Sequence, residues 1–104
     1  MITILVIDRE AGRSPAAEDP AIEVLRVRGA EQAIEKLGRN RRIDAVLLLC
    51  GPDNAAVLAS ILEEESAPPP FYAPADPPPP AGVRRLAAGS LDGLLAGIAA
   101  DLSS

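Results

Sequence analysis

The fold is decided by the stretch Asp44-Ala45-Val46-Leu47-Leu48-Leu49-Cys50-Gly51-Pro52. Five consecutive large apolar or thiol side chains, residues 46–50, stand between a charged cluster and a Gly-Pro break. A half-buried strand alternates polar and apolar residues, and this stretch does not alternate. It therefore predicts a strand covered on both faces, the central strand of a parallel sheet with helices on either side.

Apolar stretches before and after this strand supply its predicted neighbours. Residues 2–7 are β-branched and apolar and predict a strand, and residues 22–27 alternate as an edge strand does. Residues 29–39 have helical spacing, with Gly38 placed to cap the end. The remaining expected helices run over 53–65, with Asp53 or Asn54 as N-cap, and from Ser90 to the end of the chain.

The proline-rich segment 67–82 limits what can follow. Only residues 71–73 can form a strand there, and 83–87 predict a weak last strand. Four consecutive prolines, 77–80, cannot lie inside a helix, so no crossover helix fits between these two strands. The first crossover helix is shortened to residues 15–19 or missing. The right-handed crossover rule then predicts a three-layer, doubly wound, five-stranded parallel sheet of order 2-1-3-4-5, a flavodoxin-like fold.

Length and composition restrict the classes of protein that need to be considered. The 104 residues predict one domain over 1–104, and the net charge of −5 gives no electrostatic attraction to nucleic acid or anionic membranes. A single cysteine and no histidine exclude an internal disulfide and a CxxC metal pair, so no cofactor and no metal are expected. Without a signal-peptide pattern or an apolar run of roughly 20 residues, we expect a cytoplasmic chain. Heavy use of Ala, Arg, Gly and Pro indicates a GC-rich bacterial genome.

The plan resembles the receiver domain of two-component response regulators over essentially the whole chain. Residues 4–10 look like the first strand and the acidic pair of that family, and residues 29–33 look like the start of its second helix. Residues 43–48 look like the approach to its phosphoacceptor, and residues 82–86 look like its last strand. The resemblance implies a fold built to accept a phosphoryl group on an aspartate with Mg²⁺ bound by neighbouring acids.

The chain departs from that family at the residues that carry its chemistry. The phosphoacceptor position falls on Leu49, and the second acid of the pair is Arg9, a cation where a divalent metal needs an oxygen ligand. The hydroxyl position falls near residues 73–75 and the lysine position within 87–89, where neither residue type occurs. The residues Asp8, Arg9, Leu49 and Asp53 thus form a degenerate acceptor site, and the chain looks like a pseudo-receiver.

Other chemistry finds little support in the sequence, and we expect no enzyme. Cys50 has neither a histidine to activate it nor an arginine six residues later to bind an oxyanion, so a buried structural thiol is the better interpretation. Asp8, Glu10 and Asp53 could converge at the carboxyl edge of the sheet and bind a cation weakly. A residual phosphoacceptor at Asp8 or Asp53 is the corresponding enzymatic hypothesis.

Binding to proteins remains as the main functional hypothesis. The helix missing between strands 71–73 and 83–87 corresponds to the fourth helix of a receiver, and its absence would uncover the edge of strand 71–73 and the flank of the last helix. We expect that surface to bind a protein partner or a second copy, as a phosphorylation-independent module at the N-terminus of a larger bacterial signalling protein. Its expected residues are Phe71, Tyr72, Arg84, Leu91 and Leu95. The alternatives are a Pro-rich adaptor that displays Phe71 and Tyr72, or a small-ligand-binding α/β domain.

Overall fold

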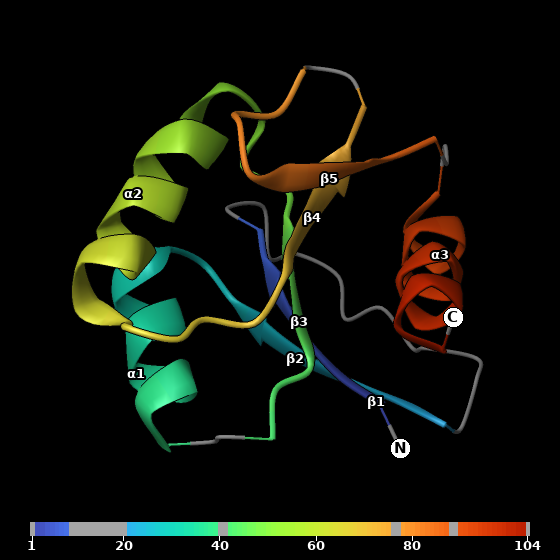
Figure 1. Ribbon diagram of the computed structural model, residues 1–104, viewed down its shortest axis with the longest axis horizontal. Helices are drawn as coiled ribbons and strands as arrows, with labels where there is room; N and C mark the ends of the chain where they lie inside the picture. The colour runs from blue at the N-terminus through green and yellow to red at the C-terminus, as the bar shows by residue number, and fades with distance from the viewer. Residues whose placement is uncertain (1, 9–20, 40–41, 76–77, 88–89, 104) are drawn as a thin grey trace.

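The computed structural model describes residues 2–8, 21–39, 42–75, 78–87 and 90–103. The strands are β1 (Ile2–Ile7), β2 (Ile22–Val27), β3 (Ala45–Leu48), β4 (Phe71–Pro74) and β5 (Val83–Leu86). The helices are α1 (Ala30–Arg39), α2 (Asn54–Glu64) and α3 (Leu91–Ser103), and a short 3₁₀ turn, η1 (Gly51–Asp53), precedes α2. The strands pair in parallel in the order β2-β1-β3-β4-β5 (Figure 1). The predicted flavodoxin-like sheet is confirmed.

The middle strand of the sheet, β3, is buried along its whole length, as its unbroken apolar sequence predicts. Val46 and Leu48 belong to the core on the side of α1 and α2, whereas Ala45 and Leu47 belong to the core on the side of α3. This alternation follows from the two-residue period of a strand. Figure 1 shows the resulting layers, with α1 and α2 together on one face of the sheet and α3 on the other.

Asp44 fixes the start of the central strand against β1. Its backbone N–H donates to the carbonyl oxygen of Thr3 at 2.8 Å, and its carboxylate Oδ2 accepts from the Thr3 N–H at 2.9 Å. These two bonds continue the pairing one residue beyond Ile4 and Ala45, the first paired residues of the two strands. The charged residue in front of the apolar run therefore satisfies backbone groups where the ladder begins.

The connection between β4 and β5 has no helix in its described residues, 75 and 78–82. Strand β5 therefore follows β4 without a crossover helix, and it is the last strand of the sheet on that side. The predicted replacement of the fourth helix by a proline-rich loop agrees with this connection between β4 and β5.

Leu62 of α2 is the one large hydrophobic side chain in the described part of the chain that is exposed, at 49%.

Two sequence-based expectations about chain ends and edges are wrong. Gly38 does not cap α1, because the helix continues through it to Arg39 and Gly38 lacks the positive φ of a glycine cap. Strand β4 has no open edge, because β3 and β5 pair with it on both sides. The shortened first helix expected over 15–19 lies outside the described residues. Among the described helices, none combines the length and hydropathy that a membrane span requires.

Candidate functional site

The carboxyl edge of the sheet is the first candidate site, because open α/β sheets bind ligands there. Asp8 follows β1, and its backbone N–H donates to the Val27 carbonyl oxygen at 2.9 Å. Its carboxylate Oδ2 accepts from Nη2 of Arg26 at 3.0 Å, and both side chains are about four-fifths buried, with 19% and 18% exposed. An acid that would otherwise be free to bind a metal is thus in an ion pair with a cation of β2.

Arg26 is the residue of this edge that the sequence interpretation missed. Its Nε and Nη1 are buried and have no hydrogen-bond partner among the described residues. The signal was present in the strand itself, since Arg26 shares the two-residue period of Ile22 and Val24, which pack on the α3 side. An arginine at an inward position beside the end of β1 indicates an ion pair with an acid from that end.

Leu49 occupies the position after the central strand where the resemblance places a phosphoacceptor. Its backbone N–H donates to the Ile7 carbonyl oxygen at 2.9 Å, which continues the β1–β3 ladder. Its side chain is half-buried and packs against the core on the α3 side. Leu49 therefore extends the core to the edge of the sheet and offers no nucleophile.

The loop after Leu49 is held by Asn54, the first residue of α2. Asn54 is 3% exposed, and its Oδ1 accepts from the Cys50 backbone N–H at 2.8 Å. Cys50 is buried, with Sγ 3.6 Å from the Ile7 carbonyl oxygen, and Gly51 supplies a positive φ of 58° at the turn. Asn54 closes this turn through a side-chain hydrogen bond, a role that its position at a helix start does not reveal.

Only two residues of the expected acidic cluster, Asp8 and Asp53, lie among the described residues. Asp53 lies in η1 and makes no side-chain capping bond to α2; its backbone N–H donates to the Cys50 carbonyl oxygen at 3.1 Å. Arg9 and Glu10 lie outside the described residues. Within the described ranges, no group of three potential metal ligands is present.

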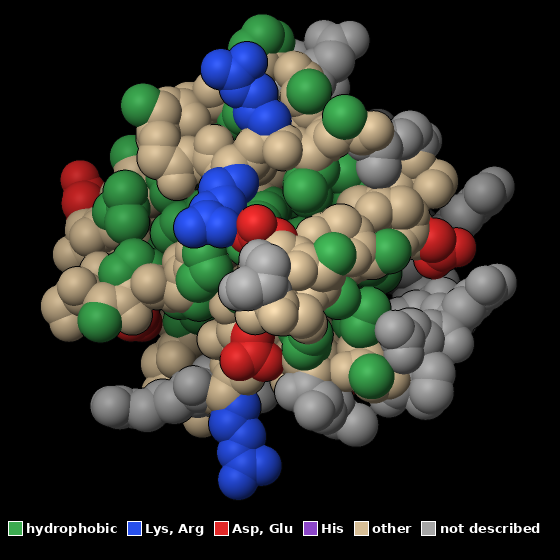
Figure 2. Space-filling model, turned by 45° about the vertical axis from the view of Figure 1, so that its right-hand side comes forward, with side chains coloured by type: hydrophobic (Ala, Val, Ile, Leu, Met, Phe, Trp, Pro, Cys, Tyr) green, Lys and Arg blue, Asp and Glu red, His purple; other side chains and the backbone are tan. Residues whose placement is uncertain are grey.

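Three of the five residues expected at the interaction surface lie in the core instead. Phe71, Tyr72 and Leu95 are buried, with 5%, 1% and 2% exposed. The reason is that β4 is an interior strand: Phe71 packs on the α1–α2 side, and Tyr72 packs with Leu95 on the α3 side. Arg84 is exposed and Leu91 is half-buried, so these two remain at the surface. Figure 2 shows hydrophobic side chains spread over one face of the molecule, with a few basic and acidic groups among them.

Tyr72, Arg84 and Asp101 form a polar cluster that ties β4, β5 and α3 together. The Tyr72 hydroxyl donates to Oδ2 of Asp101 at 2.5 Å, and Nη1 of Arg84 donates to the same oxygen. The Arg84 guanidinium carbon also lies 5.9 Å from the centre of the Tyr72 ring, a cation–π distance. The hydrogen bond from Tyr72 and the bond from Arg84 lower the pKa of Asp101. Burial, followed by the bond to Asp101, raises the pKa of Tyr72.

This cluster predicts a stability profile with losses at both ends of the pH range. Because the pKa of Asp101 is lowered from 3.8, its contribution is present above that pH and is lost as the pH falls through the folded-state pKa. Because the pKa of Tyr72 is raised from 10.0, its contribution is present below that pH and is lost as the pH rises through the folded-state pKa. Urea denaturation across pH measures both limbs.

Phenolate absorbance provides a direct check, since Tyr72 is the only tyrosine and the chain has no tryptophan. We expect the native protein to titrate at higher pH than the urea-unfolded protein, and Tyr72→Phe to reduce the alkaline loss of stability. Identical titration curves in the folded and unfolded states would contradict the buried, Asp101-bonded hydroxyl.

Together, the sheet order and its layers define an α/β domain of flavodoxin-like topology. Comparison with protein-family models finds no matching family, and searches of curated proteins and of solved structures find no matching protein.

Proposed function

We propose that this chain is a receiver-like regulatory module that binds a protein partner or a second copy without being phosphorylated. The observation that carries the proposal is the chemistry of the carboxyl edge. Leu49 stands after the central strand, and the acid after β1, Asp8, is in an ion pair with Arg26 at 3.0 Å. A phosphoacceptor needs a nucleophilic carboxylate beside a metal held by oxygen ligands. This edge instead supplies a leucine and a cation.

The surface around β5 supports binding as the remaining role. Strand β5 is at the edge of the sheet, its connection from β4 has no helix in the described residues, and Arg84 and Arg85 are exposed on it. Edge strands that lack a covering helix are sites where other chains add. Charged side chains on such an edge favour a partner of opposite charge and disfavour unspecific pairing.

The two alternatives differ in the support they receive. An adaptor that displays Phe71 and Tyr72 loses its basis, because both side chains are in the core. A small-ligand-binding domain gains support from a pocket between the carboxyl ends of α1 and α2. Such a pocket is compatible with a regulatory module, since the pocket and the β5 surface lie at different places in the fold.

Treatment with acetyl phosphate and Mg²⁺ tests the proposal. We expect an intact mass without a phosphate adduct, because no carboxylate occupies position 49. We also expect the solution mass from light scattering over a concentration series to be the same with and without both additives. An adduct that disappears in Asp8→Asn or Asp53→Asn would contradict phosphorylation-independence.

The same concentration series locates the surface. If the chain self-associates through β5, Arg85→Glu changes the solution mass, whereas Arg28→Glu, an equal charge change after the opposite edge strand β2, leaves it unchanged. A chain that stays monomeric at every concentration contradicts self-association and leaves a different protein as the partner to be tested.

A further inference from the structure

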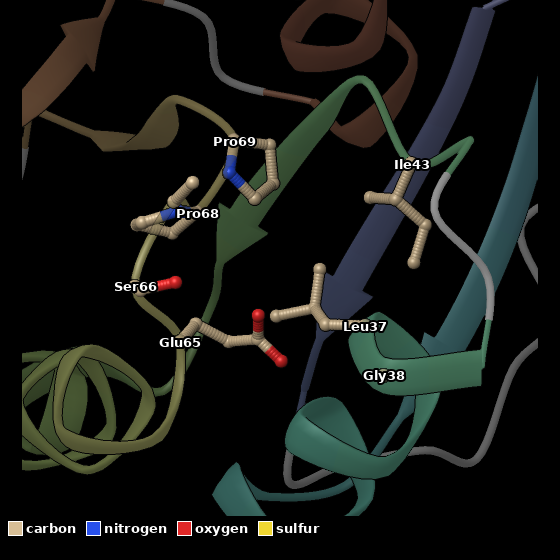
Figure 3. A pocket seen from close by; sticks show the side chains of 8 residues that line it. Leu37, Gly38, Ile43, Glu65, Ser66, Pro68 and Pro69 are labelled. Atoms are coloured by element: carbon tan, nitrogen blue, oxygen red, sulfur yellow. The ribbon is translucent and has the colours of Figure 1, made fainter.

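A pocket of about 380 Å³ lies at the end of the molecule where β3 and β4 begin, opposite the edge that carries Asp8 and Leu49. It is bounded by the last turn of α1, by Ile43, two residues before the central strand, and by the segment that joins α2 to β4. The lining residues are Leu37, Gly38, Ile43, Glu65, Ser66, Ala67, Pro68 and Pro69. In Figure 3 the Glu65 carboxylate is turned toward Leu37 across the pocket, and the Ser66 hydroxyl points to the same side.

Glu65 is the unusual residue of this pocket. It is half-buried, and its carboxylate has no hydrogen-bond or ion-pair partner among the described residues, whereas Arg39 in the last turn of α1 pairs with Glu35 at 3.1 Å. Glu65 is also the C-cap of α2, where unpaired carbonyl groups already give a negative partial charge. A carboxylate at that position works against the helix dipole, so a positive charge bound in the pocket would stabilise it.

The other walls indicate what kind of cation fits. Leu37, Ile43, Pro68 and Pro69 present aliphatic surface, and the pocket has no aromatic side chain for a quaternary ammonium group. One carboxylate and one hydroxyl are too few oxygen ligands for Ca²⁺ or Mg²⁺. The volume is near the lower end of the range for small-molecule pockets. An ammonium group on a short aliphatic stem fits both features, because the ammonium group pairs with the carboxylate and the stem packs against the aliphatic side chains.

We propose that this pocket binds a primary alkylammonium group, with its charge on the Glu65 carboxylate and Ser66 hydroxyl and its stem against Leu37, Ile43 and the two prolines. The group belongs to a free aliphatic amine or to a lysine side chain of another polypeptide, since the two share this chemistry. The proposal does not depend on the proposed regulatory function, because it concerns the opposite end of the sheet.

Titration of the full chain with 1-aminopentane, followed by amide NMR shifts, tests the proposal. We expect saturable shifts at the backbone amides of Gly38, Ile43 and Ser66, and weaker binding as the salt concentration rises. Glu65→Gln keeps the shape of the side chain and removes its charge, and should weaken binding about tenfold or more. Glu64→Gln, the same change at an exposed neighbour on α2, should bind as the unaltered chain does.

Two further probes complete the test. The neutral match 1-pentanol should bind at least about tenfold more weakly than the amine, because it lacks the charge. Nα-acetyl-lysine methylamide binding more tightly than 1-aminopentane assigns the site to a polypeptide side chain, and the reverse order assigns it to a free amine. Equal binding to Glu65→Gln, equal binding of pentanol, or no saturable shift in this pocket would each overturn the proposal. An unchanged amide spectrum elsewhere verifies the fold of both variants.

Discussion

Replacing Leu95 with alanine is expected to lower the free energy of unfolding by about 2–5 kcal/mol. Leu95 is 2% exposed on α3 and packs with Tyr72, Leu47 and Ile98 in the core on that side of the sheet. The substitution removes buried apolar surface and leaves a cavity that close-packed neighbours fill only partly. Because α3 is the described helix that covers this face, losing the Leu95 side chain weakens the packing of α3 against the sheet.

Leu62→Ala is the matched control for this prediction. It makes the same change on α2, at a leucine that is 49% exposed, and should change the free energy of unfolding by less than about 1 kcal/mol. Urea denaturation followed by far-ultraviolet circular dichroism measures both variants. An effect of Leu95→Ala as small as that of Leu62→Ala would contradict the burial of Leu95 and favour the sequence-based expectation that Leu95 belongs to an exposed interaction surface.

Replacing Asn54 with alanine is expected to lower the free energy of unfolding by about 1–3 kcal/mol. The Asn54 side chain is buried and accepts the backbone N–H of buried Cys50 at 2.8 Å. Alanine removes this acceptor from the interior, and a buried donor that loses a hydrogen bond cannot replace it with one to bulk water. The bond also holds the turn through Gly51, which forms the carboxyl edge after the central strand.

The Asn54→Asp variant tests whether a side chain of this shape with an acceptor oxygen is enough to hold the turn. Aspartate keeps an oxygen acceptor of the same shape, and a negative charge is favourable at the first residue of α2. We therefore expect it to be less destabilising at neutral pH than alanine, in the same urea experiment. If alanine proved neutral, the Cys50 N–H would have another partner, and the assigned role of Asn54 would be wrong.

The fold was predictable because its signals are local in the sequence. Unbroken apolar runs at 4–7 and 45–48 indicate strands covered on both faces, and the spacing in 30–39 and 54–64 indicates helices that cover them. The predicted last helix began correctly at its cap, since Ser90 Oγ accepts the Gly93 N–H at 3.1 Å. Steric rules for proline in turn predicted that β5 follows β4 without a helix.

Phe71 and Tyr72 were expected at the surface but are buried, because burial depends on which strands become neighbours. Phe71 and Tyr72 stand in a proline-rich segment, where the composition suggests a displayed motif, although the predicted order 2-1-3-4-5 already places their strand between the strands that the structure has as β3 and β5. Once the right-handed crossovers place β4 inside the sheet, both aromatic side chains are covered. An apolar residue beside prolines is therefore not evidence of a displayed motif.

The sequence by itself determined the parallel sheet and its order, and it determined that position 49 carries no nucleophile. Both follow from side-chain type and short-range spacing, which need no knowledge of distant residues. Only the tertiary structure decided that Arg26 pairs with Asp8, that Tyr72 and Arg84 share one oxygen of Asp101, and that Glu65 faces a pocket beside α1. The physical reason is that these groups are 17 to 29 residues apart, and chain crossovers rather than local periodicity bring them together.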